Sequence, residues 1–392
     1  MALNFSTSLI ILSMILAGCT STKVITANST PAIQADGSQS DELVLDIGIT
    51  PFDPNIPSKE EDLDNGFIIP DVRRAESGYI AYHLKDTLEL TGNWGAVRVT
   101  PKASDTVGLH INGKILISDG EKLRINIQVV DATGTIWVNK IYEDTASKFS
   151  YDVIKEDPFQ DLYNEIANDI LLVRQQASPD QISEIKTVAN LRFALDLAPN
   201  AFEGYLAENN GRFIPIQLPA EDDTMMRRLG QIKEREYVFV DTMDEYYGRF
   251  YTNMRESYDE WRLATYEEAI LLRQLQQQSR NRLIGGAALV AAGIYAGSES
   301  STYAETLASS GVVSGGIAAI RSGLNRRKDA EIHAQTLREL GQSLGSEIGP
   351  SVLKVEGETI ELKGSAEVQF GKWRDLLKAI YIEETGVTSD LQ

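Results

Sequence analysis

Between residues 43 and 177, apolar positions switch repeatedly between the period of a strand and that of a helix. A strand is predicted at residues 43–49, and a helix begins at Asp71 and ends at Thr91. Alternating patterns then predict further strands at 96–100, 106–118, 122–131 and 135–144, with a second helix opening at Asp157. This order predicts an α+β domain over 43–177, built on an antiparallel sheet with helices.

Residues 178–282 have a mainly helical pattern. The pattern breaks around Gly211, Pro215 and Pro219, and a long helix is then predicted over 241–282. Large side chains recur along that helix at alternating spacings of four and three, and they are Tyr247, Tyr251, Met254, Tyr258 and Trp261. Such a stripe is typical of core packing. Its heptad-like spacing leaves two interpretations open, packing within this chain and an intermolecular coiled coil.

Residues 283–325 are rich in glycine and predict a helical hairpin. Two uncharged arms, 283–297 and 306–320, flank a polar tip at 298–305. The small residues that would form the packing stripe are Gly285, Gly293, Gly297, Gly311, Gly315, Ala319 and Gly323. The stripe resembles the glycine zippers of some outer-membrane proteins, in which small residues let helix backbones approach closely.

Each arm holds about 15 residues and would reach only ~22 Å, against ~30 Å of hydrocarbon in a bilayer. Cations nevertheless stand outside both arms, with Arg282 before the first and Arg321 after the second. Three interpretations therefore remain open for this hairpin: packing inside the protein, self-association, and insertion into a membrane from one side.

Residues 326–392 predict a small C-terminal module. A helix is expected to run to Ile348 and to stop at Pro350. Strands at 352–356 and 359–363 would then form a hairpin, and Ser365 would cap a last helix. A unit this small has to pack on something else, and we expect the preceding helices to provide that surface.

Composition and charge exclude several functions. The 392 residues carry a net charge of −20, which argues against a nucleic-acid partner because binding phosphates needs surplus cations. One Cys and three His leave no material for a disulfide framework or a Cys-rich metal site. We therefore expect neither a metal nor a free cofactor.

Two motifs resemble functional sites but lack the residues that the chemistry needs. Ser343 stands in a Gly-x-Ser-x-Gly sequence, yet its preceding segment is helical in pattern and no His follows it. The acidic stretch around Gly66 has Leu63 at a ligand position of a calcium loop and Val72 in place of the closing Glu. We expect no catalytic residue, and a non-enzymatic protein.

The N-terminus has the features of a targeting segment. A short apolar run at residues 8–16 is followed by Leu16-Ala17-Gly18-Cys19. These residues resemble the lipobox of bacterial lipoproteins, which implies that 1–18 is a signal peptide and that Cys19 carries diacylglycerol and an N-acyl chain. The alternative is an unreactive buried Cys. Thr20 and Ser21 favour the outer membrane by the same resemblance, and the polar residues 19–42 are predicted to be a flexible tether.

The predicted domain over 43–177, with its apolar strand leading into Pro51-Phe52, loosely resembles the periplasmic domain of curli-secretion-type and Pel-type export lipoproteins. The resemblance concerns fold, and fold alone does not fix function. The sequence therefore predicts a non-enzymatic outer-membrane lipoprotein that faces the periplasm and serves as a structural or assembly component. Its partners would be the membrane, through the lipid anchor, and either further copies of itself or another envelope protein. The alternatives are a channel-like, membrane-active oligomer and a hydrolase of envelope polymers.

Overall fold

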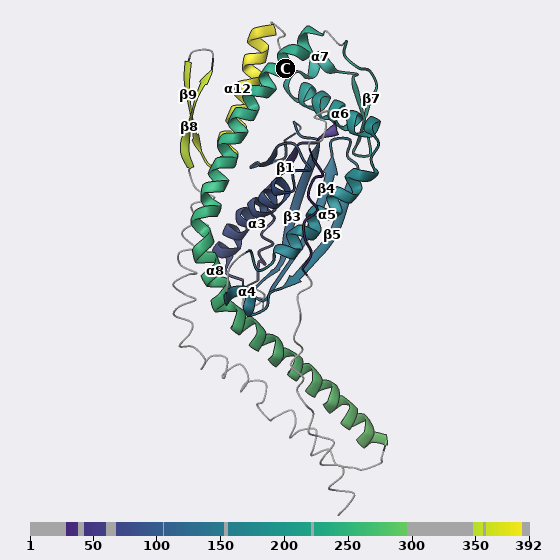
Figure 1. Cartoon of the computed structure of the whole chain (residues 1–392), viewed down its shortest axis with the longest axis vertical. Coiled ribbons are helices and arrows are strands. Elements are labelled where there is room, and N and C mark those ends of the chain that lie inside the picture. The colour runs from purple at the N-terminus through teal and green to yellow at the C-terminus, as the bar shows by residue number, and fades with distance from the viewer. Residues whose placement is uncertain are drawn as a thin grey trace, which may run out of the picture.

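The computed structural model describes residues 29–37, 43–59, 68–104, 106–152, 156–220, 223–295, 348–355 and 358–385. Its helices are α3 (Pro70–Leu90), α4 (Phe149–Asp152), α5 (Gln160–Gln176), α6 (Pro179–Leu197), α7 (Pro199–Phe202), α8 (Thr224–Tyr295) and α12 (Ala366–Thr385). Its strands are β1 (Ile47–Ile49), β2 (Val97–Val99), β3 (Leu109–Ser118), β4 (Lys122–Asp131), β5 (Ile136–Thr145), β6 (Leu206–Asn209), β7 (Arg212–Pro215), β8 (Ile348–Val355) and β9 (Glu358–Gly364). Figure 1 shows the five-stranded sheet at the centre, with α8 along one side.

The predicted α+β fold is confirmed, but the central sheet is mixed rather than wholly antiparallel. Its strand order is β2-β1-β3-β4-β5. Strands β3, β4 and β5 pair antiparallel, whereas β1 pairs parallel with both β2 and β3. The reason lies in the connection, because α3 carries the chain from the end of β1 back to the start of β2, and such a helical crossover joins parallel strands.

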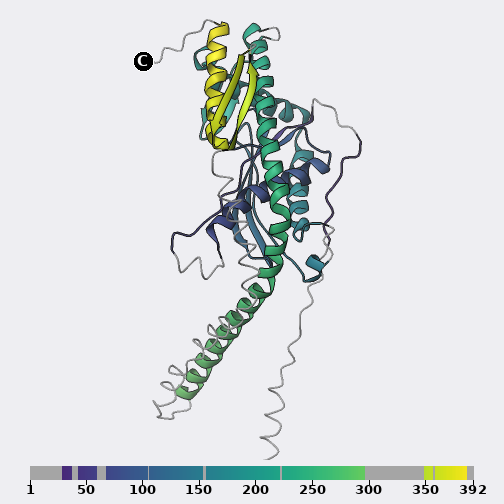
Figure 2. The same ribbon diagram turned by 90° about the vertical axis from the view of Figure 1, so that its left-hand side faces the viewer.

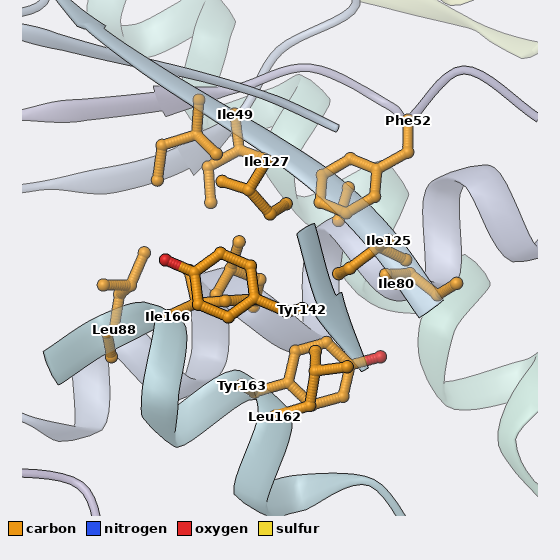
Figure 3. Close-up of a cluster of buried hydrophobic side chains, with 14 of the residues drawn as sticks. Ile49, Phe52, Ile80, Leu88, Ile125, Ile127, Tyr142, Leu162, Tyr163 and Ile166 are labelled. Atoms are coloured by element: carbon orange, nitrogen blue, oxygen red, sulfur yellow. The ribbon is translucent and has the colours of Figure 1, made fainter. Parts of the chain in front are cut away.

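One face of the sheet is packed against helices. Alternate residues of β4 are buried, as the pattern of this strand predicts, beginning with Leu123 and Ile125. Figure 3 shows Ile125 and Ile127 facing side chains from the helices, among them Leu162 and Ile166 of α5. The segment after β1 joins this core through Phe52, which is 1% exposed.

The long helix α8 begins before the predicted residue 241 and ends after residue 282. It packs against α3 and β2. Four of the five large residues of its stripe are buried in the core of this chain, and they are Tyr247, Met254, Tyr258 and Trp261. Packing within the chain is therefore confirmed for this part of α8. Beyond it, the helix projects away from the sheet (Figure 1).

Among the helices that the structure describes, none combines the length and the apolar character that a membrane span requires.

The C-terminal module packs on the preceding helices, as expected. Helix α12 contacts α8 and α6, and Figure 2 shows it beside the N-terminal half of α8. Trp373 of α12 stacks on Phe239 of α8 with 5.2 Å between ring centroids. Ser365 caps α12 as predicted, because its hydroxyl oxygen accepts the backbone N–H of Val368 at 3.4 Å.

One local prediction is confirmed in part and another is wrong. The predicted break in the helices around Gly211 is present, and it is formed by a β-hairpin, β6–β7, whose two-residue turn Asn210-Gly211 has positive φ at both positions. Ile348 is the first residue of β8 and not the end of a helix, and Pro350 lies within that strand. The register of β8 against β9 shifts between Ile348 and Ser351, which accommodates a residue that lacks a backbone N–H. The rest of the predicted helix, 329–347, lies outside the described residues.

Candidate functional site

The residues predicted from the sequence to carry function lie mainly outside the part of the chain that the structure describes. Only Gly285 and Gly293 of the predicted glycine zipper are in the described chain, in the last turns of α8. The others are outside it, and they are Cys19, Gly297, Gly311, Gly315, Ala319 and Gly323. Ser343 and the acidic loop around Gly66 are outside as well. Lipidation and zipper packing therefore stay predictions.

The described residues contain no group of three or more His, Cys, Asp and Glu that could hold a metal ion. The features that stand out are two buried ion-pair clusters on α8, a docked N-terminal segment and one cavity.

The first cluster, here called the Arg262 cluster, joins α8 to the α+β domain. It consists of Arg262, Asp259 and Tyr258 of α8, Asp157 just before α5, and Glu76 of α3. The Arg262 side chain is 1% exposed, its Nη2 lies 3.0 Å from Oδ2 of Asp157, and it also pairs with Asp259. Its guanidinium lies 4.4 Å from the centroid of the Tyr258 ring, a cation–π contact. Burial alone would raise the pKa of Asp157, but the charge of Arg262 lowers it below its ordinary value, so this pair is ionised.

Glu76 extends the same cluster to α3 and β3. Its carboxylate accepts the hydroxyls of Tyr258 at 3.0 Å and Ser118 at 2.7 Å, and it pairs with Arg73 at 2.8 Å. Burial outweighs these partners and raises the pKa of Glu76. One helix, α8, is thus bonded to α3, to the start of α5 and to the end of β3.

The second cluster, here called the Glu236 cluster, joins α8 to α12 and α6. It consists of Glu236 of α8, Arg374 of α12, Asp196 of α6 and Ser104 in the loop before β3. Nη1 of Arg374 lies 2.7 Å and 2.5 Å from the two oxygens of Glu236, and Ser104 donates to the same carboxylate at 3.1 Å. Arg374 also pairs with Asp196. Burial raises the pKa of Glu236 even though Arg374 opposes the shift.

The N-terminal segment, residues 29–35, is bound along α5. The backbone N–H of Thr30 donates to Asp161 at 2.7 Å, and that of Ile33 donates to Asn168 at 2.8 Å. Asn164 donates in return to the carbonyl of Thr30 at 2.9 Å. The prediction that all of residues 19–42 form a flexible tether is therefore wrong for 29–35. Its polar composition serves hydrogen bonding to helix side chains and not only solvation.

The N-terminal segment and α8 leave the body of the protein at the same end. Thr30 is bonded in the first turn of α5, and Asp157, just before that helix, is paired with Arg262 of α8. Two turns further along α8, the side chain of Ala269 is still buried. Residues 271–295, here called the α8 extension, continue beyond the body in this direction (Figures 1 and 2).

A cavity of about 390 Å³ lies between α6, α8 and the segments that lead into β1, β2 and β3. Its lining residues are Val44, Leu45, Asp46, Gly95, Thr106, Gly108, Lys186, Ala189, Asn190 and Lys233. Nζ of Lys233 donates to Oδ1 of Asn190 at 2.8 Å, and Asp46 accepts the backbone N–H of Ala96 at 2.9 Å. Burial lowers the pKa of Lys233. The carboxylates of Asp46 and Glu236 oppose the shift, and the charge of Lys186 adds to it.

Sequence reasoning identified neither of these clusters nor the cavity. Arg262 had a detectable signal, since it is a cation directly after Trp261 of the apolar stripe and three residues after Asp259. The sequence around Glu236 and Lys233 carries no such signal, because the residues that they bond lie more than 40 positions away in the chain.

No protein-family model matches the chain, and no curated protein matches it significantly in sequence.

Proposed function

We propose that the chain is a lipid-anchored protein of the outer membrane, facing the periplasm, that serves as a non-enzymatic structural or assembly component. In this proposal the body is held at the membrane surface by two attachments, the acylated Cys19 and the apolar end of the α8 extension. The observation that carries the proposal is that the N-terminal segment and the α8 extension leave the body at the same end.

The reach of the two attachments supports a common membrane. Ten residues lie between Cys19 and Thr30, the first residue bonded to α5, and at ~3.3–3.6 Å per residue the eleven steps span at most ~40 Å. The α8 extension holds 25 residues, and at ~1.5 Å per residue it reaches ~38 Å beyond the body. The lipid on Cys19 and the tip of α8 can therefore lie at the same depth.

The composition of the α8 extension supports membrane contact at its tip. Residues 283–295 carry no charge, whereas Arg280 and Arg282 stand directly before them. Cations next to an apolar segment interact with anionic headgroups while the apolar residues enter the boundary with the acyl chains. The rigid connection matters here, because the Arg262 cluster fixes the direction of α8 relative to the body.

The test places an environment-sensitive fluorophore on α8 of the acylated protein. Since Cys19 would be blocked by acylation, Val290→Cys and the matched control Gln277→Cys each offer a single thiol for an NBD label. In vesicles of phosphatidylethanolamine and phosphatidylglycerol, we expect NBD at residue 290 to shift to the blue and to be quenched by nitroxide-labelled lipids. NBD at residue 277 should keep the emission seen in water. Equal, water-like emission at both positions would refute the second attachment.

Flotation with the same vesicles tests the first attachment separately. Cys19→Ser should lower the fraction of protein that floats with the vesicles, since stable anchoring requires more than one membrane signal. If Cys19→Ser floats as well as the native chain, the lipid anchor is not what holds the protein. Native mass in detergent then tests the channel-like alternative, which requires a discrete ring of many copies.

A further inference from the structure

The cavity between α6, α8 and the segments that lead into β1, β2 and β3 has the chemistry of a ligand site. None of its lining residues belongs to the two proposed membrane attachments. On a chain with a net charge of −20, two lysines, Lys186 and Lys233, line the same recess. The charge of Lys186 depresses the ionisation of Lys233, so the two ammonium groups lie within Coulombic range of each other. The chain as a whole has 57 Asp and Glu against 37 Lys and Arg, so a recess lined by two lysines and one carboxylate differs from its average charge.

The carboxylate in the lining, that of Asp46, already accepts a hydrogen bond from the protein. Asp46 is the carboxylate of the lining, and its Oδ1 accepts the backbone N–H of Ala96 at 2.9 Å. The Tyr237 hydroxyl lies 3.5 Å from its other oxygen. Lys233 contacts Asn190, a neutral acceptor, and its ammonium lies 5.6 Å from the centroid of the Tyr237 ring. The lining thus holds two lysines and one carboxylate, and the carboxylate of Glu236 acts on Lys233 from outside the lining.

Part of the wall is apolar. Val44, Leu45 and Ala189 form this part, and Leu45 is 1% exposed. The volume, about 390 Å³, is in the lower part of the range of small-molecule sites. A ligand that suits this cavity has one charged end and a short apolar body.

We propose that the cavity binds a small amphiphilic anion, a carboxylate or a phosphate monoester, with its oxyanion on Lys186 and Lys233 and its short alkyl part against Val44, Leu45 and Ala189. Residues from α6, α8 and the segments that lead into β1, β2 and β3 surround the ligand. Binding therefore stabilises the packing of α6 and α8 beside these segments, and it is independent of the membrane attachments proposed above.

The experiment is isothermal titration of the full chain with butyrate and with n-butyl phosphate, with butanol as the uncharged control. We expect saturable binding of at least one anion and none of butanol. Lys233→Met and Lys186→Met should each weaken binding by at least about tenfold, the size of one lost charge-assisted hydrogen bond. Lys102→Met, at an exposed lysine outside the cavity, should leave the dissociation constant unchanged.

Two further measurements keep the test sharp. Asn190→Asp changes an exposed residue and places a carboxylate beside Lys233, so it should also weaken binding of the anion. NMR of the lysine side chains should show the pKa of Lys233 rising when the anion binds, because the anion stabilises the ammonium. Tighter binding of butyl phosphate would assign the site to phosphate esters, and tighter binding of butyrate would assign it to carboxylates.

The proposal is overturned if neither anion binds saturably at 50 mM, or if Lys233→Met and Asn190→Asp bind as the native chain does. It is also overturned if Lys102→Met weakens binding as much as Lys233→Met, because binding is then a property of surface charge in general. None of these results bears on the fluorescence and flotation of the α8 extension, so this inference and the proposed function fail separately.

Discussion

The two clusters that hold α8 both place one arginine between two carboxylates, but the pKa of the buried carboxylate is lowered in one, at Asp157, and raised in the other, at Glu236. Arg262 is surrounded by two carboxylates and by the face of Tyr258, and its charge keeps Asp157 ionised. Glu236 has one cationic partner, Arg374, which it shares with Asp196, and burial raises its pKa. Loss of the cation is costly for a carboxylate that is buried and ionised, and less costly for one whose raised pKa lets it take up a proton. The two attachments of α8 should therefore differ in strength.

The largest effect is expected from Arg262→Met. This change leaves Asp157 buried without its cation, and such losses typically cost about 3–5 kcal/mol in the free energy of unfolding. Denaturant unfolding followed by circular dichroism measures the change. Arg255→Met, at an exposed arginine two turns earlier on α8, is the control and should change the free energy by less than about 0.5 kcal/mol. Equal effects of the two variants would show that the Arg262 cluster does not fix α8.

A pair of glycines tests how closely the β3–β4 turn approaches α8 at the same cluster. Gly120 has φ of +81°, and a Cβ there would lie 2.3 Å from the carbonyl oxygen of Arg262. Gly204 has φ of +85°, and a Cβ there meets nothing within 4 Å. Gly204→Ala should therefore cost only the backbone strain, about 1–2 kcal/mol. Gly120→Ala adds a clash with α8 and should cost about 2–4 kcal/mol. Thermal unfolding of both variants measures the difference, and equal losses would mean that the turn can move away from α8 freely.

Glu236→Gln should have a smaller effect than Arg262→Met. The amide keeps an acceptor for Ser104, and Arg374 retains Asp196, so we expect a loss of about 1–2 kcal/mol. Glu234→Gln, an exposed neighbour on α8, is the matched control and should have almost no effect. If Glu236→Gln destabilises the protein as much as Arg262→Met does, the two clusters are equally strong and the comparison fails.

Acid should act with opposite signs on two single carboxylates, Asp157 of the Arg262 cluster and Glu236 of the Glu236 cluster. The pKa of Asp157 in the folded state is below its ordinary value of 3.8, so its contribution is complete above that pH and is lost as the pH falls further. The pKa of Glu236 is above 4.5, so the folded state gains stability relative to the unfolded chain as the pH falls through that raised pKa. Unfolding free energies between pH 6 and pH 3 test both signs. Asp157→Asn should flatten the loss below pH 4, and Glu236→Gln should remove the gain at higher pH. A slope unchanged by either variant would contradict the assignment.

The elements that could be predicted from sequence are those defined by local pattern. Strand β4 was predicted with its exact bounds, because its alternation is complete from Lys122 to Asp131. The hairpin at Asn210-Gly211 was missed although Asn-Gly is a strong turn signal, since the two proline residues nearby favoured a simple helix break. The parallel pairing of β1 and the Glu236 cluster depend on residues far apart in the chain. No local pattern carries that information.

The smallest effect is expected where the N-terminal segment meets α5. Asn164 and Asn168 bond the backbone of residues 30–33 from one face of this helix, at partly exposed positions. Asn168→Ala should therefore change the global free energy of unfolding by no more than about 1 kcal/mol. Hydrogen exchange should instead accelerate locally, at the amide of Ile33, which donates to Asn168. The amide of Ile47, which pairs with Ala96 in the sheet, is the internal control and should keep its protection.

Release of the N-terminal segment also has a consequence for the membrane. Freeing the five residues from Thr30 to Gln34 lengthens the connection to Cys19, by up to ~17 Å at ~3.4 Å per residue. The α8 extension keeps its length, so the chain between Cys19 and the body would become longer than the α8 extension. Thr30 is also bonded to Asp161 and Asn164, so release of the whole segment requires Asp161→Ala, Asn164→Ala and Asn168→Ala together. If both attachments are used together, this triple variant should leave the emission of NBD at residue 290 unchanged, because the α8 extension then sets the distance of the body from the membrane. A shift of that emission towards the value in water would mean that the docked N-terminal segment sets the distance instead.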